Sequence, residues 1–422
     1  MTVVAFSHTG AKMASASGIR AIMDDIAVST AAAAGGRPWL NLGIGNPAYI
    51  PEVAAAWQRL TMAALSENFA EASCRYGPSR GTPELVGAIV AYFRGRYGWD
   101  IGAQNVVVGP GSQLLGFIAA ALFTGPGPAG GSKLVLPVVP DYTGYQGLVL
   151  TPGGIAGIEP VLEPDGGRSF RYQIDFAALE RRDDIGMLLL SSPSNPAGRC
   201  LEAAEQDRLI ALATARDVPL MIDNAYGEPF PCIGSTFVPP AWHPQVINCF
   251  TLSKAGLPGE RIGFAIGSEA YIGPMVSFLA NSALHAAQLA QHTIARALGS
   301  GALDTMVASS ITPFYAQRRK LAESLLLDSL PASLAWRLHA STGGMFCWLW
   351  VDHDWFDDLA LYQALKRKRV FVVPGRHFFT SQARPGPSGA HARQCFRLSI
   401  SAPEAELTDG IGLIGETLAE MG

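Results

Sequence analysis

The sequence has neither an excess of basic residues nor a long apolar run. Lys and Arg number 31 against 35 Asp and Glu, which gives a formal net charge of -4. The chain therefore lacks the net positive charge that is typical of nucleic-acid-binding proteins. No apolar stretch approaches the roughly 20 residues of a membrane-spanning helix, and the N-terminus lacks the basic region and apolar core of a signal peptide. We therefore expect a cytoplasmic protein that binds neither nucleic acid nor membrane.

Metal-binding motifs and paired cysteines are missing as well. The six cysteines are scattered without a C-x-x-C pair, and the eight histidines form no H-E-x-x-H motif. This distribution favours buried thiols in a reducing compartment over a disulfide framework or a zinc site. We expect no metal.

What the sequence does contain is an alternation of short apolar runs and helix-like segments between residues 100 and 270. The strand candidates lie at 105–109, 133–139, 186–192, 219–223, 246–252 and 262–267. Several are apolar throughout, which is typical of strands covered on both faces. With helices between them, they predict an α/β fold with a large, doubly wound, mostly parallel sheet.

The length of 422 residues suggests two or three structural units. A long helix is predicted at 303–330, interrupted or started afresh at Pro313, and a smaller α+β pattern of strands and helices follows it. We expect an N-terminal arm at 1–55 that packs with the smaller unit, a large domain at 56–300 and a small C-terminal domain at 301–422.

Ligands in open α/β sheets bind outside the carboxyl ends of the strands, so the residues that follow each strand candidate are the first place to look for a site. After the first strand, Gly111, Ser112 and Gln113 open a helix, where free N–H groups and the helix dipole suit a phosphate. After the second, Tyr142 is placed to cover a planar ligand. Alone, each is equally an ordinary helix cap or a loop tyrosine.

The next two strand ends add polar groups. Asn195 stands between two prolines in "PSNPAG", which a turn alone would also explain. Asp223 directly follows a buried apolar run, with Tyr226 three residues further on. A buried carboxylate needs a cationic or hydrogen-bonding partner, and a protonated pyridine nitrogen would serve.

The fifth strand leads into "TLSKAGLPGERIG", residues 251–263. Thr251 and Ser253 offer hydroxyls to a phosphate or a turn, and Arg261 beyond the Pro-Gly turn offers a fixed cation. Lys254 between them is a candidate nucleophile. Together the strand ends supply what a pyridoxal phosphate (PLP) site requires: a lysine that forms an imine, an acid for the ring nitrogen, and groups for the phosphate and the ring oxygen.

A substrate carboxylate also has a candidate partner. In "CFRLSIS" the alternation buries Phe396 and Leu398 while Arg397 points the other way. An arginine that faces the cleft between domains suits bidentate binding of a carboxylate. A solvent-exposed strand arginine would be the better reading if it stood alone.

With these residues in view, the sequence resembles the class I/II aminotransferases, which have the aspartate aminotransferase fold (PLP fold type I). The matching segments occur in family order over nearly the whole chain: "NLGIGNP", "YGPSRGTPEL", "GPGSQ", "PDYTGY", "SSPSNPAG", "DNAYGEPF", "LSKAGLPGERIG" and "FRLSIS". Such an order and spacing are highly specific, whereas any one motif would not be.

The resemblance implies roles for individual residues. Asn195 and Tyr226 would bind the ring oxygen of PLP, Lys254 would carry the imine, and Asn195 would also lie at the substrate. The glycine of "NLGIGNP", Gly45, would lie near the substrate. The tyrosine of "YGPSRG", Tyr76, would reach the phosphate of the neighbouring subunit, which implies a homodimer with shared sites.

Within the family, stretches such as "IGNPAYIPE", "LPGERIG" and "VPGRHFF" look most like the members that exchange an amino group between valine and pyruvate. The expected activity is thus amino-group exchange between a small apolar L-amino acid and a 2-oxo acid. One alternative is a PLP-dependent synthase of specialised metabolism that uses the same quinonoid intermediate to form C–C or C–N bonds. Another is a transcription regulator, which would need an N-terminal helix-turn-helix, where this chain instead has "GIRAIMDDI" and "NLGIGNP".

Overall fold

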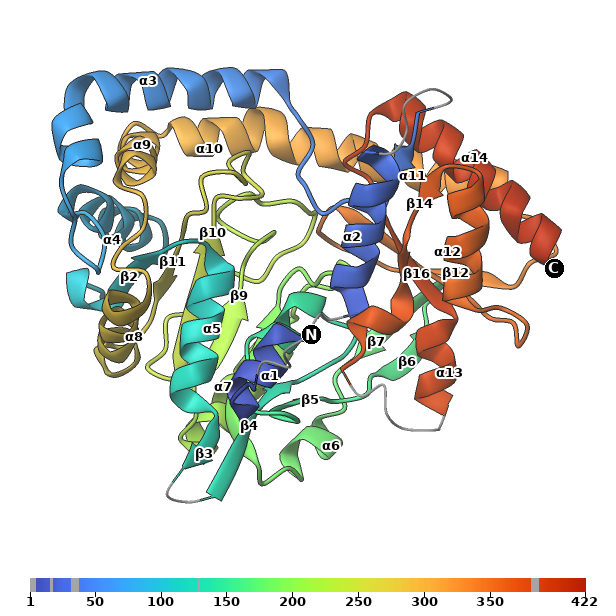
Figure 1. Cartoon of the computed structure of the whole chain (residues 1–422), viewed down its shortest axis with the longest axis horizontal. Coiled ribbons are helices and arrows are strands. Elements are labelled where there is room, and N and C mark those ends of the chain that lie inside the picture. The colour runs from blue at the N-terminus through green and yellow to red at the C-terminus, as the bar shows by residue number, and fades with distance from the viewer. Residues whose placement is uncertain (1–4, 16–17, 32–37, 128–129, 381–386) are drawn as a thin grey trace.

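Two sheets, one large and one smaller, form the body of the protein, and helices pack around both (Figure 1). The structure is a computed structural model that describes residues 5–15, 18–31, 38–127, 130–380 and 387–422. Parts of the predicted N-terminal arm, residues 1–4, 16–17 and 32–37, lie outside this description. Among the described helices, none is both long and apolar enough to cross a bilayer.

The larger sheet has eight strands in the order β2-β11-β10-β9-β8-β4-β3, and β5 also pairs with β4. The strands β4, β8, β9 and β10 run parallel to one another, whereas β11 runs antiparallel between β10 and β2. All six predicted strands are present, which confirms the expected α/β fold with a mostly parallel sheet. The bounds are β2 (Val106–Gly109), β3 (Gly125–Gly127), β4 (Gly130–Leu136), β5 (Ile155–Gly157), β8 (Ile185–Ser191), β9 (Leu220–Asp223), β10 (Val246–Thr251) and β11 (Gly263–Ile266).

Helices cover both faces of this sheet because its strands are apolar on both sides. Val106 and Val108 pack in one core cluster with α3, α4 and α9, while Val107 between them packs in a second cluster with α5, α7 and α8. Successive side chains of a strand point to opposite faces, so the two sets of helices lie on opposite sides. Their bounds are α3 (Pro51–Cys74), α4 (Pro83–Tyr97), α5 (Ser112–Phe123), α6 (Phe176–Glu180), α7 (Ala203–Arg216), α8 (Glu269–Ser282) and α9 (Gln288–Gly299).

The predicted helix at 303–330 connects the large sheet to the C-terminal part of the chain, and it is built in three pieces. The pieces are α10 (Ala302–Met306), a π-helical turn (Val307–Ile311) and α11 (Thr312–Ser329). Pro313 is the second residue of α11 and directly follows the π-helical turn, and Met306, Ile311 and Thr312 keep helical backbone angles. A new α-helical segment thus starts beside this proline, as predicted, but the chain stays helical and changes its hydrogen-bond pattern before Pro313 instead of breaking there.

The smaller sheet has six strands in the order β15-β16-β13-β12-β7-β6. Two of them, β6 and β7, come from residues 161–173, well before the rest of this sheet in the sequence. The helices α11, α12 and α14 belong to this part of the molecule (Figure 1). The bounds are β6 (Val161–Pro164), β7 (Ser169–Gln173), β12 (Trp336–His339), β13 (Phe346–Val351), β15 (Val373–Pro374), β16 (Cys395–Ser399), α12 (Asp358–Arg367), α13 (Pro387–Arg393) and α14 (Glu404–Met421).

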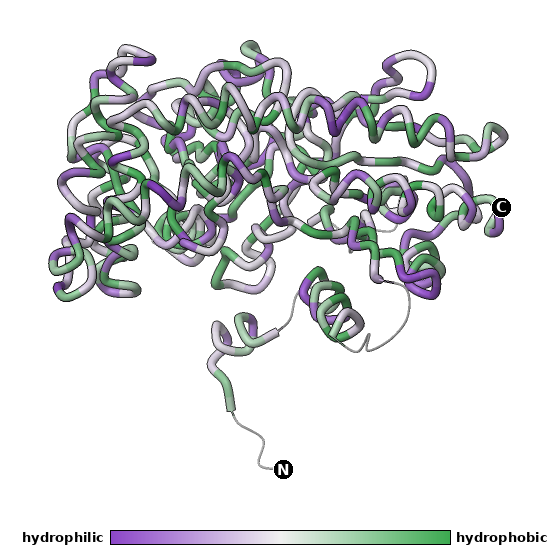
Figure 2. Tube along the Cα trace, turned by 90° about the horizontal axis from the view of Figure 1, so that it is seen from above, coloured by the Kyte–Doolittle hydropathy of each residue, from purple (hydrophilic) through white to green (hydrophobic). Residues whose placement is uncertain are grey.

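Two N-terminal helices, α1 (His8–Ala14) and α2 (Gly18–Ala31), lie on one side of the body, outside its sheets (Figure 2). The α2 helix is attached to the C-terminal part, because Asp25 accepts hydrogen bonds from Tyr362 at 2.6 Å and Lys366 at 2.5 Å. A short parallel pair of β1 (Leu40–Asn41) and β14 (Val370–Phe371) makes a second attachment.

Candidate active site

A cavity of about 780 Å³ opens at the carboxyl ends of the parallel strands. Its floor is made by the residues that end β8, β9 and β10 and by the first turn of α5, and β16 and the two N-terminal helices complete its walls. The cavity brings together most of the predicted site residues: Gly45, Ser112, Gln113, Tyr142, Asn195, Asp223, Tyr226, Thr251, Ser253, Lys254, Arg261 and Arg397. The sheet topology explains the meeting, because parallel strands end at the same edge.

Lys254 lies in the turn after β10 and reaches into this cavity. Its Nζ donates a 2.6 Å hydrogen bond to the carbonyl oxygen of Gly45 and lies 5.9 Å from the centre of the Tyr226 ring. Burial lowers the pKa of Lys254 to about 8, with further lowering by the positive charges of Arg397 and Arg261. The amine is therefore neutral, and nucleophilic, over a larger part of the physiological pH range than an ordinary lysine.

Asp223, the last residue of β9, is buried, and only one of its two carboxylate oxygens has a hydrogen-bond partner among the described residues. Its Oδ2 accepts a 3.0 Å hydrogen bond from the hydroxyl of Tyr145, whereas its buried Oδ1 has no partner among the described residues. Burial raises the pKa of Asp223 to about 6, although the bond from Tyr145 opposes this rise. An unpaired carboxylate oxygen that lines a cavity suits a protonated nitrogen of a bound group.

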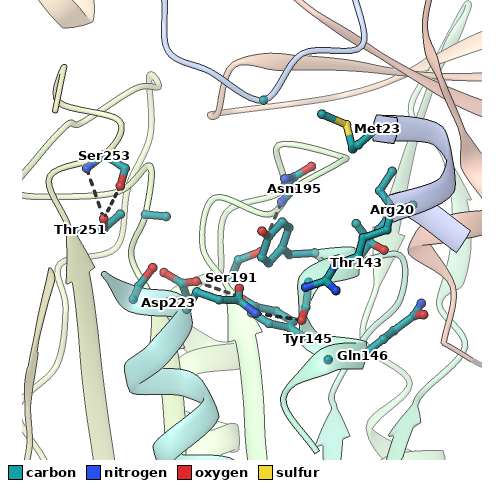
Figure 3. A pocket seen from close by; sticks show the side chains of 18 of the residues that line it. Arg20, Met23, Thr143, Tyr145, Gln146, Ser191, Asn195, Asp223, Thr251 and Ser253 are labelled. Carbon is teal, nitrogen blue, oxygen red and sulfur yellow. Dashed lines mark hydrogen bonds between the residues drawn. The ribbon is translucent and has the colours of Figure 1, made fainter. Parts of the chain in front are cut away.

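Sequence reasoning overlooked a second buried carboxylate, Asp141, which stands just before Tyr142 in the "PDYTGY" motif. It accepts hydrogen bonds from the hydroxyl and the N–H of Ser191, the latter at 3.1 Å, and from the N–H of Tyr142 at 2.7 Å. Ser191 in turn accepts from the N–H of Asn195 at 3.2 Å (Figure 3). Asp141 thus fixes the loop of Tyr142 to the end of β8. The sequence signal that could have identified Asp141 was its position directly before Tyr142, the aromatic residue expected at the site.

An anion cradle lies at the start of α5. Gly111 precedes the helix with a left-handed φ of 84°, and a Cβ there would lie 2.7 Å from Nη2 of Arg261. The glycine therefore lets the arginine approach the helix N-terminus, where the first N–H groups have no helical acceptor. Arg261 also donates a 3.4 Å hydrogen bond to Ser253, whose own N–H is 3.2 Å from Oγ1 of Thr251.

Gln113, also predicted in this cradle, has its side chain engaged elsewhere, because its Nε2 donates a 3.1 Å hydrogen bond to the carbonyl of Gly144. The backbone N–H of the first turn remains the part of Gln113 that suits an anion. The amide side chain instead holds the short 3₁₀ helix Thr143–Gly147 against α5.

Arg397 of β16 is buried, with 6% of its surface exposed. Its guanidinium donates 2.8 Å hydrogen bonds to Oδ1 of Asn195 and to the carbonyl of Gly43, and lies 3.9 Å from the ring centre of Phe346. Burial lowers the pKa of Arg397 to about 10, and its Nε has no partner among the described residues. A buried arginine with spare donors and no carboxylate in contact suits an anionic ligand.

Tyr76 is the predicted residue that stands apart. Its side chain is 88% exposed, it does not line the cavity, and its ring meets His285 edge-on at 6.1 Å.

Sequence reasoning also missed the residues of the two N-terminal helices that line the cavity. Lys12 and Met13 of α1 and Ile19, Arg20 and Met23 of α2 line the cavity on the side away from the strand ends. Figure 3 shows Arg20 and Met23 reaching into it from α2. No local motif marks them, because only the packing of these helices brings them to the site.

The residues present fit PLP, by the chemistry that its parts require. The unpaired Oδ1 of Asp223 matches a protonated pyridine nitrogen, and the glycine-lined helix start with Arg261 matches a phosphate. The amine of Lys254 opens into the same cavity. Three independent features of one cavity thus agree with a single cofactor.

Comparisons with known proteins point the same way. The family model of the class I and II aminotransferases matches residues 37–414. The chain is 33% identical over 419 residues, 98% of each chain, to the valine–pyruvate aminotransferase of Escherichia coli K12. It is similar in structure, with a TM-score of 0.85, to the valine–pyruvate aminotransferase of Salmonella typhimurium LT2, at 30% identity over 96% of this chain and 99% of that one.

A more distant structure shows the same fold. The kynurenine aminotransferase of Pyrococcus horikoshii, solved in complex with PMP, matches with a TM-score of 0.78 at 22% identity, covering 98% of this chain and 97% of that one. The family model and the two valine–pyruvate aminotransferases favour the predicted aminotransferase over the alternative synthase. The chain belongs to the class I and II aminotransferases, a family that in general depends on PLP, and it is a transaminase.

Proposed function

We propose that this transaminase uses PLP to exchange the amino group of a small apolar L-amino acid, of the valine or alanine type, with pyruvate. The observation that carries the cofactor is made at Asp223, which lines the same cavity as Lys254 and whose buried Oδ1 has no hydrogen-bond partner among the described residues. The substrates are proposed from the names of the two relatives that are 33% and 30% identical to this chain.

Each part of the cofactor has a proposed partner. Lys254 would hold it covalently through Nζ, Asp223 would keep a proton on the ring nitrogen, and Tyr142 would cover one face of the ring. Asn195 and Tyr226 would bind the ring oxygen. The phosphate would bind the first turn of α5 and the polar groups beside it: Gly111, Ser112, Gln113, Thr251, Ser253, Arg261 and, from a second subunit, Tyr76. When bound, PLP supplies an electron-withdrawing ring that stabilises negative charge at the substrate α-carbon.

The chain itself performs the remaining work. Arg397 binds the α-carboxylate of the substrate with the guanidinium that Asn195 and the Gly43 carbonyl hold in place. The lowered pKa of Lys254 raises the fraction of neutral amine, which can take a proton from the α-carbon of the amino acid and, in the reverse half-reaction, give one to the α-carbon derived from the 2-oxo acid. Gly45, whose carbonyl accepts from Lys254, lies where the substrate would enter.

Apolar side chains agree with an apolar substrate. Ile19 and Met23 are four residues apart on α2, so they share the helix face that lines the cavity. A branched side chain of the size of valine would bury its methyl groups against such a wall, at roughly 0.8 kcal/mol per CH₂.

We also propose a homodimer with shared sites. Three large apolar residues of α3 are exposed: Met62 and Leu65, which are three positions apart, and Phe69, which lies just beyond the kink at Asn68. Tyr76 follows the end of the helix. Met62 and Phe69 expose 62% and 56% of their surface. A group of large exposed apolar side chains close together in the chain is typical of a protein interface.

The test is a pair of half-reactions with purified PLP-loaded protein. L-alanine or L-valine should shift the cofactor absorbance and release pyruvate or the branched 2-oxo acid, and pyruvate added to the aminated protein should yield alanine. A spectral change with amino acid that releases no 2-oxo acid would contradict the proposal and favour bond formation at the substrate instead.

A further inference from the structure

Asp141 is a buried carboxylate that has no role in the proposed function. It is 2% exposed and does not line the cavity, although Tyr142 and Ser191, which donate hydrogen bonds to it, both do. Its donors are uncharged, and burial raises the pKa of Asp141 to about 7 although the bonds from Ser191 and Tyr142 oppose this rise. A carboxylate that is costly to bury and that contacts residues of a site is more typical of a functional group than of a core.

A chain of hydrogen bonds leads from Asp141 to Arg397. Ser191 donates its hydroxyl to Asp141 and accepts with the same oxygen from the N–H of Asn195 at 3.2 Å (Figure 3). Asn195 in turn accepts with Oδ1 a 2.8 Å bond from Nη1 of Arg397. A hydroxyl has one proton and two lone pairs, so the carboxylate of Asp141 fixes where that proton points and leaves a lone pair of Ser191 for Asn195.

A second connection reaches the same guanidinium through the backbone of Asp141. The N–H of Asp141 donates a 3.1 Å hydrogen bond to the carbonyl of Phe378. Phe378 ends the 3₁₀ helix Gly375–Phe378, and its ring centre lies 5.2 Å from the guanidinium carbon of Arg397, within the range of a cation–π contact. Asp141 is therefore tied to two neighbours of Arg397, to Phe378 directly and to Asn195 through Ser191.

We propose that Asp141 is a positioning residue for the substrate carboxylate, because it orients Ser191, which places Asn195 against Arg397. This inference rests on the proposed function, in which Arg397 binds that carboxylate. Asn195 and the Gly43 carbonyl each take one donor of the guanidinium. The donors that remain thereby keep a fixed direction, which the two parallel hydrogen bonds of an arginine–carboxylate pair require.

Two variants interrupt the chain of hydrogen bonds at different points. Asp141→Asn has one acceptor oxygen in place of two, so at least one of the donors of Ser191 and Tyr142 loses its acceptor. Ser191→Ala removes the hydroxyl and leaves the bond between Asp141 and Tyr142 in place. Asp175→Asn is the matched control, because Asp175 accepts a 2.9 Å hydrogen bond from the N–H of Ala178 at the start of α6, outside the cavity.

Binding of unreactive ligands reports on the position of Arg397 without turnover. The acid 3-methylbutanoate and the amide 3-methylbutanamide have the same carbon skeleton and no amino group, and only the acid is charged. Both can be titrated against the cofactor absorbance of the PLP-loaded protein. We expect the wild type to bind the acid roughly 10- to 100-fold more tightly than the amide, as hydrogen bonds between charged groups provide. Asp141→Asn and Ser191→Ala should lower this ratio about fivefold or more, and Asp175→Asn should leave it unchanged.

A double variant tests whether the effect passes through Asn195. In Asn195→Ala the acceptor for Nη1 of Arg397 is absent, so adding Ser191→Ala should change the ratio of acid to amide binding by less than about twofold. A general loss of stability would not depend on Asn195 in this way. If Ser191→Ala lowers the ratio as much in the Asn195→Ala protein as in the wild type, Asn195 is not the link and the proposal is wrong.

The outcomes separate this inference from the proposed function. A wild-type preference for the acid that Asp141→Asn and Ser191→Ala leave unchanged would overturn the role of Asp141 and leave the proposed function intact, even where both variants unfold at a lower temperature. A wild type without this preference, or a preference that survives in Arg397→Gln, would overturn the proposed role of Arg397 and the inference that rests on it. Where Asp141→Asn does not fold, the result for Ser191→Ala decides alone, because that variant keeps the buried carboxylate.

Discussion

Nη1 of Arg397 donates a 2.8 Å hydrogen bond to Oδ1 of Asn195, a residue 202 positions away in the sequence. The bond joins the smaller sheet to the loop that follows β8 of the larger one, at the wall of the cavity. A second bond from the same guanidinium to Gly43 adds the N-terminal segment. Three distant parts of the chain thus fix the group proposed to bind the substrate carboxylate.

Loss of this arginine should impair substrate binding more than cofactor binding. We expect Arg397→Gln to lower kcat/KM for L-alanine about 100-fold or more, the usual scale for removing a buried, hydrogen-bonded charge from an ion pair. The dissociation constant of PLP, measured by absorbance, should change only a few-fold. An equal loss of PLP affinity would show instead that Arg397 maintains the whole site.

Covalent attachment of the cofactor should depend on Lys254. In the wild-type protein, borohydride reduction should add the cofactor mass to the peptide that contains this lysine. Lys254→Ala should show neither the added mass nor turnover, while Lys320→Ala, which removes an exposed lysine of α11, should behave as the wild type. Cofactor mass on another lysine of the wild-type protein would refute the assignment.

The capture of PLP by the cofactor-free protein should depend on pH with a midpoint near the pKa of Lys254, about 8. Only the neutral amine attacks, so the rate should rise with pH through this value and level off above it. Arg397→Gln removes a cation that lowers this pKa, so the midpoint should move to higher pH. Asp223→Asn removes an anion that raises it, so the midpoint should move to lower pH. Stopped-flow absorbance measures both, and shifts in the same direction would contradict the electrostatic account.

Asp223 should destabilise the cofactor-free protein at neutral pH. Folding raises its pKa from 3.8 to about 6. Well below pH 4 the carboxyl is neutral in both the folded and the unfolded protein. As the pH rises from about 4 to 6, the unfolded chain ionises first, so the folded protein loses stability. At pH 8 the loss is about 3 kcal/mol in the free energy of unfolding.

The variant Asp223→Asn measures this loss. Without cofactor, it should be more stable than the wild type at pH 8, and thermal unfolding should show the difference shrinking toward pH 4. With PLP the order should reverse, because the cofactor gives the wild-type carboxylate its missing partner. A variant that is less stable than the wild type at pH 8 without cofactor would argue against an unpaired charge.

Shared active sites should be visible by mixing two inactive variants. In a heterodimer of Lys254→Ala and Tyr76→Ala, one site combines an intact Lys254 with an intact Tyr76 from the other subunit. After dissociation and reassociation of equal amounts, we expect about a quarter of the wild-type activity, since half of the dimers are mixed and each has one intact site. Activity no higher than the average of the two variants would rule out a contribution of Tyr76 across the interface.

The interface itself can be tested at α3. Phe69→Asp places a charge among the exposed apolar side chains of α3, so light scattering should show a shift from dimer to monomer. Asp207→Asn, on the exposed surface of α7, serves as a control that should leave the mass unchanged.

The strands and the residues at their ends were predictable from the sequence. Apolar β-branched runs determine where the central strands lie, and parallel strands end at one edge, which brings Asp223 and Lys254 into one cavity. The structure adds Asp141 and Tyr145, whose hydrogen bonds depend on the fold of a loop rather than on a pattern. These two residues stand beside predicted ones but their partners, Ser191 and Asp223, are far away in the sequence.

The sequence by itself determined the family, the mostly parallel sheet and the motif residues at its edge, because these depend on local periodicity and short spacings. Only the tertiary structure decided that β6 and β7 join the smaller sheet, that Arg397 is buried against Asn195, and that α2 brings Arg20 and Met23 to the cavity. Such contacts arise when apolar faces and ion pairs of separate segments meet, as Ile26 and Asp25 do with the C-terminal part. No local pattern records the partner, so packing alone brings these residues to the cavity.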